Sequence, residues 1–186
     1  MKRLTAILLI VTATPAMSQM AASRASKATK ASNAAVSTAG TFWEQMTGNI
    51  AKAAEQMPES DYSFRPVATV RTFGQLIGHV AGAQALICGS ALGEKTAGED
   101  DIEKSKTTKA DLLAALKTTT EYCRKAYAMS DARGAGMTKL FGQDQTRLSA
   151  LMLNATHNAE HYGNIVTYMR VKGMVPPSSQ PATPRP

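Results

Sequence analysis

The three histidines of this 186-residue chain are the residues whose spacing points most directly to chemistry. His157 and His161 lie four positions apart, so on a helix they share one face with Cβ atoms about 5–6 Å apart. That spacing lets two imidazoles bind one metal ion at about 2.0–2.1 Å. A third ligand has to come from another element, and His79 is the only histidine left. The three residues are therefore candidate metal ligands, with an open fourth position of the kind found in catalytic sites.

A histidine pair at this spacing also arises by chance, and its rings are then ordinary hydrogen-bonded core or surface groups. The pair is not the zincin motif, because Asn158 follows His157 where that motif keeps its glutamate. Convergence with His79 is possible if the second and fourth helices run antiparallel. His79 would then stand about seven residues after the start of its helix and His161 about eleven before the end of the other. At about 1.5 Å per residue, the heights of His79 and His161 along the bundle axis differ by roughly 6 Å.

Helical periodicity supplies the elements that must position these side chains. Apolar residues spaced three and four apart predict four helices: Thr38 to Met57, a second from Thr72 to a stop at Gly93, a third from Thr108 to Tyr127, and a fourth from Gln145 to Lys172. The predicted apolar stripes include Phe42 and Met46 in the first helix and Met152 in the fourth, and Tyr168 shares the histidine face. Strand signals are nearly absent, and residues 93–108 are expected to form a solvated loop. The pattern predicts an all-α four-helix bundle.

The two ends of the chain have compositions of their own. Residues 1–18 combine a basic start, an apolar run and small residues before Ser18, which is typical of a secretory signal peptide cleaved after Ser18. An amphipathic helix or a buried strand is the alternative. We expect a flexible linker over 19–37, the bundle over 38–175 and a disordered Pro-rich tail over 176–186. The protein would then be periplasmic or secreted.

The overall composition limits the classes of partner. The chain is 44% hydrophobic and carries a formal net charge of +7, of which Lys2 and Arg3 in the signal peptide supply +2, leaving +5 (7 − 2). No apolar run approaches the roughly 20 residues of a membrane span, so we expect no stable membrane anchor. No basic stripe with interleaved aromatics is present, and we expect no nucleic-acid binding. The expected partner is a small-molecule substrate, and a homodimer is left open.

Three stretches of sequence resemble the DinB-like family. The run from His157 to Ser179 resembles the last helix and exit of that family, and the segments Met57–Pro66 and Val70–His79 resemble its first loop and second helix. The resemblance covers about residues 38–179 and implies a four-helix bundle whose second and third helices run parallel, joined by a long crossover. It also implies a divalent metal, zinc or nickel, on His79, His157 and His161. Characterised relatives include thiol-dependent transferases and isomerases, and the family name does not imply DNA binding.

The parallel arrangement that the resemblance implies bears on the two cysteines, Cys88 and Cys123. They lie 16 and 15 residues after their helix starts, Thr72 and Thr108, and would stand level. Antiparallel helices would offset them by about 15 Å, too far for a disulfide. We hypothesise a disulfide, with two buried inert thiols as the alternative.

Three functions are compatible with these features. The first is an exported metal-dependent enzyme of hydrolase or thiol-linked transferase type. The second is a non-catalytic metal- or ligand-binding helical module. The third is a partner-binding bundle without metal. No residue beyond the three histidines receives a catalytic role from the sequence.

Overall fold

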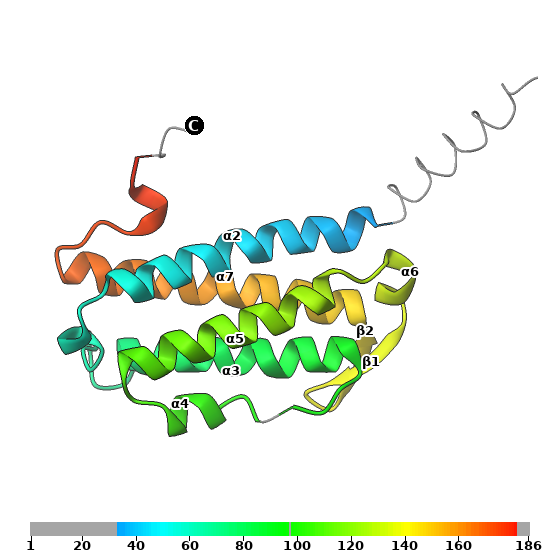
Figure 1. The fold of residues 1–186 in the computed structure, drawn as a ribbon, viewed down its shortest axis with the longest axis horizontal. Helices are drawn as coiled ribbons and strands as arrows, with labels where there is room; N and C mark the ends of the chain where they lie inside the picture. Colours follow the sequence, from blue (N-terminus) through cyan, green and yellow to red (C-terminus); the bar gives the residue numbers. More distant parts are fainter. Residues whose placement is uncertain (1–32, 97, 182–186) are drawn as a thin grey trace, which may run out of the picture.

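The computed structural model describes residues 33–96 and 98–181. The expected signal peptide, and the expected linker up to residue 32, lie outside this range. Four long helices dominate the described part: α2 (Ala34–Gln56), α3 (Phe73–Leu92), α5 (Lys109–Tyr127) and α7 (Arg147–Val171) (Figure 1). The predicted all-α four-helix bundle is confirmed.

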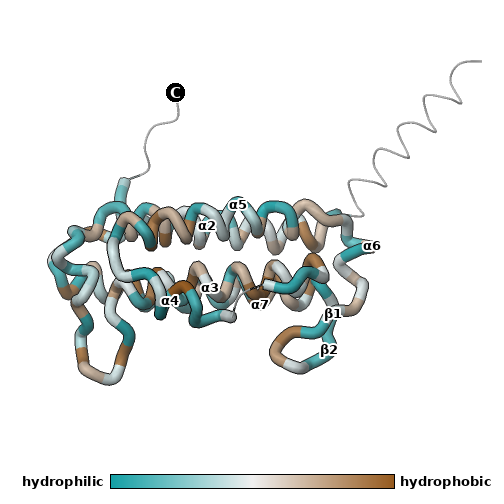
Figure 2. The backbone as a smooth tube through the Cα atoms, turned by 60° about the horizontal axis from the view of Figure 1, so that its bottom comes forward, coloured by the Kyte–Doolittle hydropathy of each residue, from teal (hydrophilic) through white to brown (hydrophobic). Residues whose placement is uncertain are grey.

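The helices pack as two layers, with α2 beside α5 in one and α3 beside α7 in the other (Figure 2). α3 and α5 run parallel, while α2 and α7 run in the opposite direction (Figure 1). A parallel pair cannot be joined by a short turn, so residues 93–108 cross back along the length of α3. α3 therefore lies antiparallel to α7, the arrangement in which the three histidines can converge.

Local capping explains why three of these helices begin where the sequence predicts. At α3, the Thr72 hydroxyl accepts from Gln75 N at 3.2 Å and the Gln75 side chain accepts from Thr72 N at 2.9 Å, which is a complete capping box. Thr108 caps α5 and Thr146 caps α7 by the same kind of hydroxyl contact. Gly93 ends α3 with a φ of 81°, a conformation that glycine adopts without strain.

The first long helix begins four residues earlier than predicted, inside the expected linker. The Asp131 carboxylate, from the short helix α6 (Asp131–Gly134), accepts from Ala35 N at 3.1 Å and from Val36 N at 2.9 Å. These contacts satisfy free amides of the first turn of α2 from almost a hundred residues away. Val36 is buried as a result. A long-range cap of this kind leaves no local signal in the sequence.

The apolar stripes of α2 and α7 are rotated relative to the prediction. Phe42 is 59% exposed and Met152 54% exposed, whereas the neighbouring Trp43 is buried. Trp43 is accommodated because its Nε1 donates to Gln84 Oε1 at 2.7 Å across the core. The buried positions of α7 include two amides, Asn154 and Asn158, that the apolar pattern passed over. Polar pairs therefore occupy part of the core.

A β-hairpin separates α6 from α7, although strand signals are nearly absent from the sequence. Strand β1 (Met137–Leu140) pairs antiparallel with β2 (Gln143–Thr146). The two loop residues, Phe141 and Gly142, have φ values of 51° and 77°. Two consecutive positive φ angles define the tight hairpin turn for which Asn-Gly is the usual signal. A phenylalanine in the first position hides that signal.

The crossover, residues 93–108, is not the solvated loop that its composition predicts. It contains the short helix α4 (Asp101–Ser105), which packs along α3 (Figure 1). Gly78 and Gly82 of α3 make the approach possible. A Cβ on Gly78 would lie 2.8 Å from Glu103 Cα, and one on Gly82 would lie 1.8 Å from the Glu99 carbonyl oxygen. Only glycine at these two positions lets the crossover backbone lie on the helix.

The beginning of the Pro-rich tail, expected to be disordered, folds against the bundle. A 3-10 turn, η2 (Pro177–Ser179), follows α7, just as η1 (Glu59–Asp61) follows α2. The Tyr162 hydroxyl donates to Ser178 Oγ at 2.9 Å and accepts from Ser178 N at 2.9 Å. Residues 176–181 therefore form part of the described fold, and the rest of the tail lies outside it.

α3 is the one described helix that is long and apolar enough to cross a membrane by length and composition. Its apolar window is 72% buried inside the bundle, and a core helix passes the same test. Its neighbours α5 and α7 cover it from either side, and the crossover covers a third face. The central position of α3 accounts for its hydrophobicity.

Candidate metal centre

All three histidines meet between α3 and α7. His157 Nε2 lies 3.1 Å from His79 Nε2 and 3.0 Å from His161 Nε2. One nitrogen from each ring lies within 4.8 Å of the others. His79 comes from the middle of α3, and the other two come from adjacent turns of one face of α7. Because α3 and α7 are antiparallel, His79 lies at about the same height along the bundle as His157 and His161.

Burial keeps these rings neutral. It lowers the pKa of His161 to about 3, with the neighbouring His157, His79 and Arg71 adding to the effect. Burial likewise lowers the pKa of His79 to about 4, assisted by Arg71 and His157. The pKa of His157 is lowered for the same main reason, although the nearby Glu160 opposes the shift. At neutral pH each ring therefore carries one nitrogen lone pair.

The ring arrangement suits a divalent metal ion. The Nε2 atoms of His79 and His161 lie 3.1 and 3.0 Å from His157 Nε2, and one nitrogen of each of the three neutral rings lies within 4.8 Å of the others. In the tautomer with the proton on Nδ1, the Nε2 lone pairs would repel one another, and a bound cation would relieve that repulsion by accepting them. At Zn–N distances of about 2.0–2.1 Å, ligand nitrogens stand roughly 3.0–3.5 Å apart, which agrees with the spacing seen here. The residues present therefore fit the metal that the sequence predicts.

Within the described part of the chain, only one of the three rings has a hydrogen-bonding group within 3.5 Å of its Nδ1 atom. A histidine that binds through Nε2 keeps its proton on Nδ1. Near His161 Nδ1 lies the Asn164 side-chain amide at 3.4 Å, whose oxygen and nitrogen can exchange places. The Nδ1 atoms of His79 and His157 are buried and lack a hydrogen-bond partner.

Two carboxylates of the crossover flank His79, and sequence reasoning missed both. Glu99 Oε1 lies 3.6 Å from His79 Nε2, and Glu103 Oε2 lies 3.6 Å from His79 Nδ1. Burial raises the pKa of Glu99, and the adjacent Asp100 raises it further. The available signal was the glycine spacing of α3, because Gly78 and Gly82 lie four apart on one face and mark a close backbone approach. The charged composition of residues 93–108 concealed it.

Arg71 connects the crossover to the rest of the site. Its Nε donates to both oxygens of Glu103, at 3.1 and 3.0 Å. The Tyr168 hydroxyl of α7 donates to the Arg71 carbonyl oxygen at 2.5 Å. Tyr168 shares the histidine face, as predicted, and contacts the Arg71 backbone through this hydrogen bond. Glu160, in contrast, is exposed.

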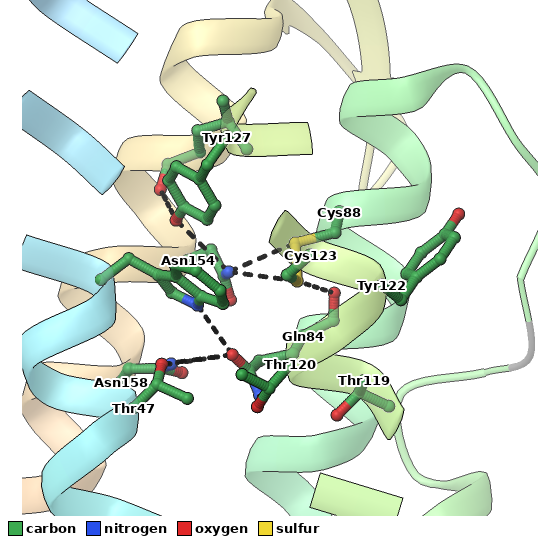
Figure 3. The surroundings of a disulfide bond; sticks show 12 residues. Thr47, Gln84, Cys88, Thr119, Thr120, Tyr122, Cys123, Tyr127, Asn154 and Asn158 are labelled. Carbon is green, nitrogen blue, oxygen red and sulfur yellow. Dashed lines mark hydrogen bonds between the residues drawn. A yellow bond between two sulfur atoms is a disulfide. The ribbon is translucent and has the colours of Figure 1, made fainter. Parts of the chain in front are cut away.

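The two cysteines form a disulfide in the structure. Cys88 of α3 and Cys123 of α5 have Cα atoms 5.3 Å apart and are bonded. Asn154 Nδ2 from α7 points at both sulfurs, at 3.4 and 3.7 Å, and also at the Tyr127 hydroxyl at 3.3 Å (Figure 3). The bond holds the parallel helices level, in the arrangement that the DinB-like resemblance implies.

A four-helix bundle with a parallel central pair and a histidine cluster between its second and fourth long helices defines the class of protein. The model of the DinB superfamily matches residues 43–165, about two thirds of the sequence, and the chain belongs to this superfamily. No curated protein matches the chain.

Solved structures show the same fold. A DinB-like protein from Bacillus cereus is 19% identical, with a TM-score of 0.65 over 75% of this chain and 93% of that one. A DinB-like protein from Bacillus subtilis is also 19% identical, with a TM-score of 0.62 over 78% and 99%. A mutant of the mycothiol-dependent maleylpyruvate isomerase is 14% identical, with a TM-score of 0.57 over 80% of each chain.

Proposed function

We propose that this protein is an exported metal-dependent enzyme that acts on a small molecule, with zinc or nickel held by His79, His157 and His161. The observation that carries the proposal is the cluster of three neutral imidazoles, in which His157 Nε2 lies 3.1 Å from His79 Nε2 and 3.0 Å from His161 Nε2. A purely structural zinc site is closed by four protein ligands, whereas three histidines leave a position for substrate.

A metal in such a site supplies Lewis acidity, which lowers the pKa of a coordinated water or thiol towards neutrality. The chain supplies the surrounding groups. The buried imidazoles stay neutral, and Glu99 lies beside His79 Nε2 with its side chain 29% exposed. Its Oε1 is placed to accept a proton from a water or thiol that approaches the open side of the cluster. We therefore propose hydrolysis or thiol-linked transfer as the reaction class.

The thiol-linked class has a specific support. One structural neighbour is named as a mycothiol-dependent isomerase, so this fold serves thiol chemistry in at least one protein. A sequence identity of 14% supports a shared fold but does not support a shared substrate. We propose a small thiol as co-substrate to be tested alongside hydrolysable esters and amides.

Metal content followed by activity tests the proposal. Protein purified without chelator should contain close to one zinc or nickel ion per chain by elemental analysis, and His79→Ala should contain little. The loaded wild type should turn over members of an electrophile and ester panel, assayed with and without added thiols, while His79→Ala should not. Less than about a tenth of an ion per chain in the wild type would contradict the proposal and favour a partner-binding bundle.

A non-catalytic metal-binding module is the alternative. It is favoured by the position of the cluster, which would link α3 to α7 when a metal binds. Stoichiometric metal without turnover of any substrate in the panel would support this alternative.

Export is the remaining part of the proposal. The disulfide between Cys88 and Cys123 supports it, because such bonds persist in oxidising compartments and are rare in the cytosol. Mass spectrometry of the mature protein should find an N-terminus at Gln19. Recovery of the full-length chain from the cytosol would contradict export.

A further inference from the structure

The crossover places an ion pair directly behind His79, on the side away from the histidine cluster. We propose that Glu103, held by Arg71, is the positioning residue of the metal centre: it accepts the Nδ1 proton of His79 and so fixes the ring for binding through Nε2. This inference rests on the proposed metal binding.

The first support is a missing hydrogen bond at His79. Its Nε2 faces the other two rings, so the neutral ring that binds a cation there must carry its proton on Nδ1. That Nδ1 is buried and lacks a partner. Glu103 Oε2 lies 3.6 Å away, beyond hydrogen-bond length by about half an ångström. The proposed hydrogen bond requires the two atoms to approach by that amount.

The second support is the way Glu103 itself is held. Arg71 Nε donates to both of its oxygens, and the Tyr168 hydroxyl in turn anchors the Arg71 backbone. The Glu103 side chain is only 13% exposed. A chain of contacts therefore runs from α7 through Arg71 and the crossover to α3, and it ends on a histidine.

The third support is that the fold makes room for this contact. Gly78 lies one residue before His79, and a Cβ there would meet Glu103 Cα at 2.8 Å. The absence of that Cβ brings the Glu103 backbone directly onto the helix beside the ring. Asp100 also lies near His79, but its carboxylate pairs with Lys104 at 3.1 Å at an exposed position. Glu103 is thus the buried acceptor.

Metal affinity measures the proposed role without any assay of activity. Zinc affinity is determined at fixed pH by competition with a chromophoric chelator for wild type, Glu103→Ala and Glu103→Gln. Removal of a carboxylate behind a metal-bound histidine weakens binding about 10–100-fold, and we expect a loss of that size for Glu103→Ala. Glu103→Gln keeps an acceptor oxygen and the side-chain shape, so its loss should be smaller.

A matched control separates this contact from general charge effects. Asp101→Asn removes a charge from the same short helix. It keeps a side-chain oxygen that can accept the hydrogen bond that Gly98 N donates to Asp101 Oδ2 at 2.7 Å. Its zinc affinity should stay within about twofold of wild type. A second readout is the proton NMR signal of His79 Nδ1–H in the zinc-loaded protein, which should move upfield in Glu103→Gln.

The outcomes distinguish the inference from the proposed function. Wild type that binds zinc, with Glu103→Ala within twofold of it, overturns the positioning role and leaves the metal site intact. An unmoved Nδ1 proton signal in Glu103→Gln overturns it as well, even if Glu103→Ala fails to fold. Wild type that binds no divalent metal overturns both.

Discussion

His79 lies between two acidic side chains, each 3.6 Å from one of its ring nitrogens, yet burial keeps its pKa near 4. A group with a folded-state pKa below its unfolded value of 6.5 takes up more protons when the chain unfolds. The unfolded state therefore gains from acidification, and the folded state loses stability as pH falls below about 6.5. The same sign holds for His161, whose pKa is about 3.

The metal-free protein should accordingly lose stability between pH 7.5 and pH 5. Each buried histidine contributes a slope of at most about 1.4 kcal/mol per pH unit, and partial solvent access makes the actual slope smaller. Urea unfolding in chelator at several pH values measures it. The variant His79→Gln, which cannot titrate there, should show a shallower slope, and equal slopes would contradict the assigned pKa.

At the scale of elements, the contact between α3 and the crossover depends on glycine. Gly82→Ala would place a Cβ 1.8 Å from the Glu99 carbonyl, so the crossover backbone must move. We expect a loss of about 1–3 kcal/mol in the free energy of unfolding, as for other overpacked contacts. Zinc binding should weaken as well, because Glu99 and Glu103 move with the backbone.

Gly48→Ala in α2 is the control for that substitution. No atom lies within 4 Å of a Cβ at Gly48, so alanine should stabilise the helix by about 0.5–1 kcal/mol. Urea unfolding of both variants gives the comparison. Equal effects of the two substitutions would show that the crossover does not need Gly82.

The disulfide is the second contact between elements that can be tested. The sequence separation of Cys88 and Cys123 is 35, and for a loop of that length chain entropy predicts a stabilisation of about 3–4 kcal/mol. The double variant Cys88→Ala/Cys123→Ala should be destabilised by about that amount in urea. Thiol titration of denatured wild type should find no free thiol before reduction, and two free thiols would contradict the pairing.

For the molecule as a whole, a metal held between α3 and α7 should raise the melting temperature. Zinc at about 100 times its Kd adds about 2.7 kcal/mol to the free energy of unfolding, since it binds only the folded chain. For a domain of this size that corresponds to roughly 5–10 °C. Calorimetry with and without zinc measures the shift. His157→Ala should show almost none, and a shift equal to that of wild type would place the metal elsewhere.

The apolar face between α2 and α7 bears on assembly. Phe42 and Met152 are more than half exposed there, although periodicity predicts both for the core. The homodimer left open by the sequence remains a prediction.

The rotation of the apolar stripes of α2 and α7 has a physical cause. Buried amides such as Gln84 and Asn158 pair with Trp43 and Thr47, and they occupy core positions that an apolar pattern alone does not reveal.

Much of the fold follows from local sequence. Helix periodicity and hydroxyl caps place α3, α5 and α7 within about two residues of their predicted starts, since both signals act within one turn. The i, i+4 spacing likewise places His157 and His161 on one face. The start of α2 differs from the prediction because its cap, Asp131, comes from a distant element.

By itself, the sequence determined the four helices, the three histidines and, through the resemblance, the parallel pair that carries the two cysteines. The tertiary structure alone decided what surrounds His79. Glu99 and Glu103 have no periodicity that marks them, and their charges are typical of a solvated loop. Their position depends on where a crossover can lie, which is set by the missing Cβ atoms of Gly78 and Gly82 on a different helix. Contacts between distant segments are a property of packing, and packing exists only in the folded chain.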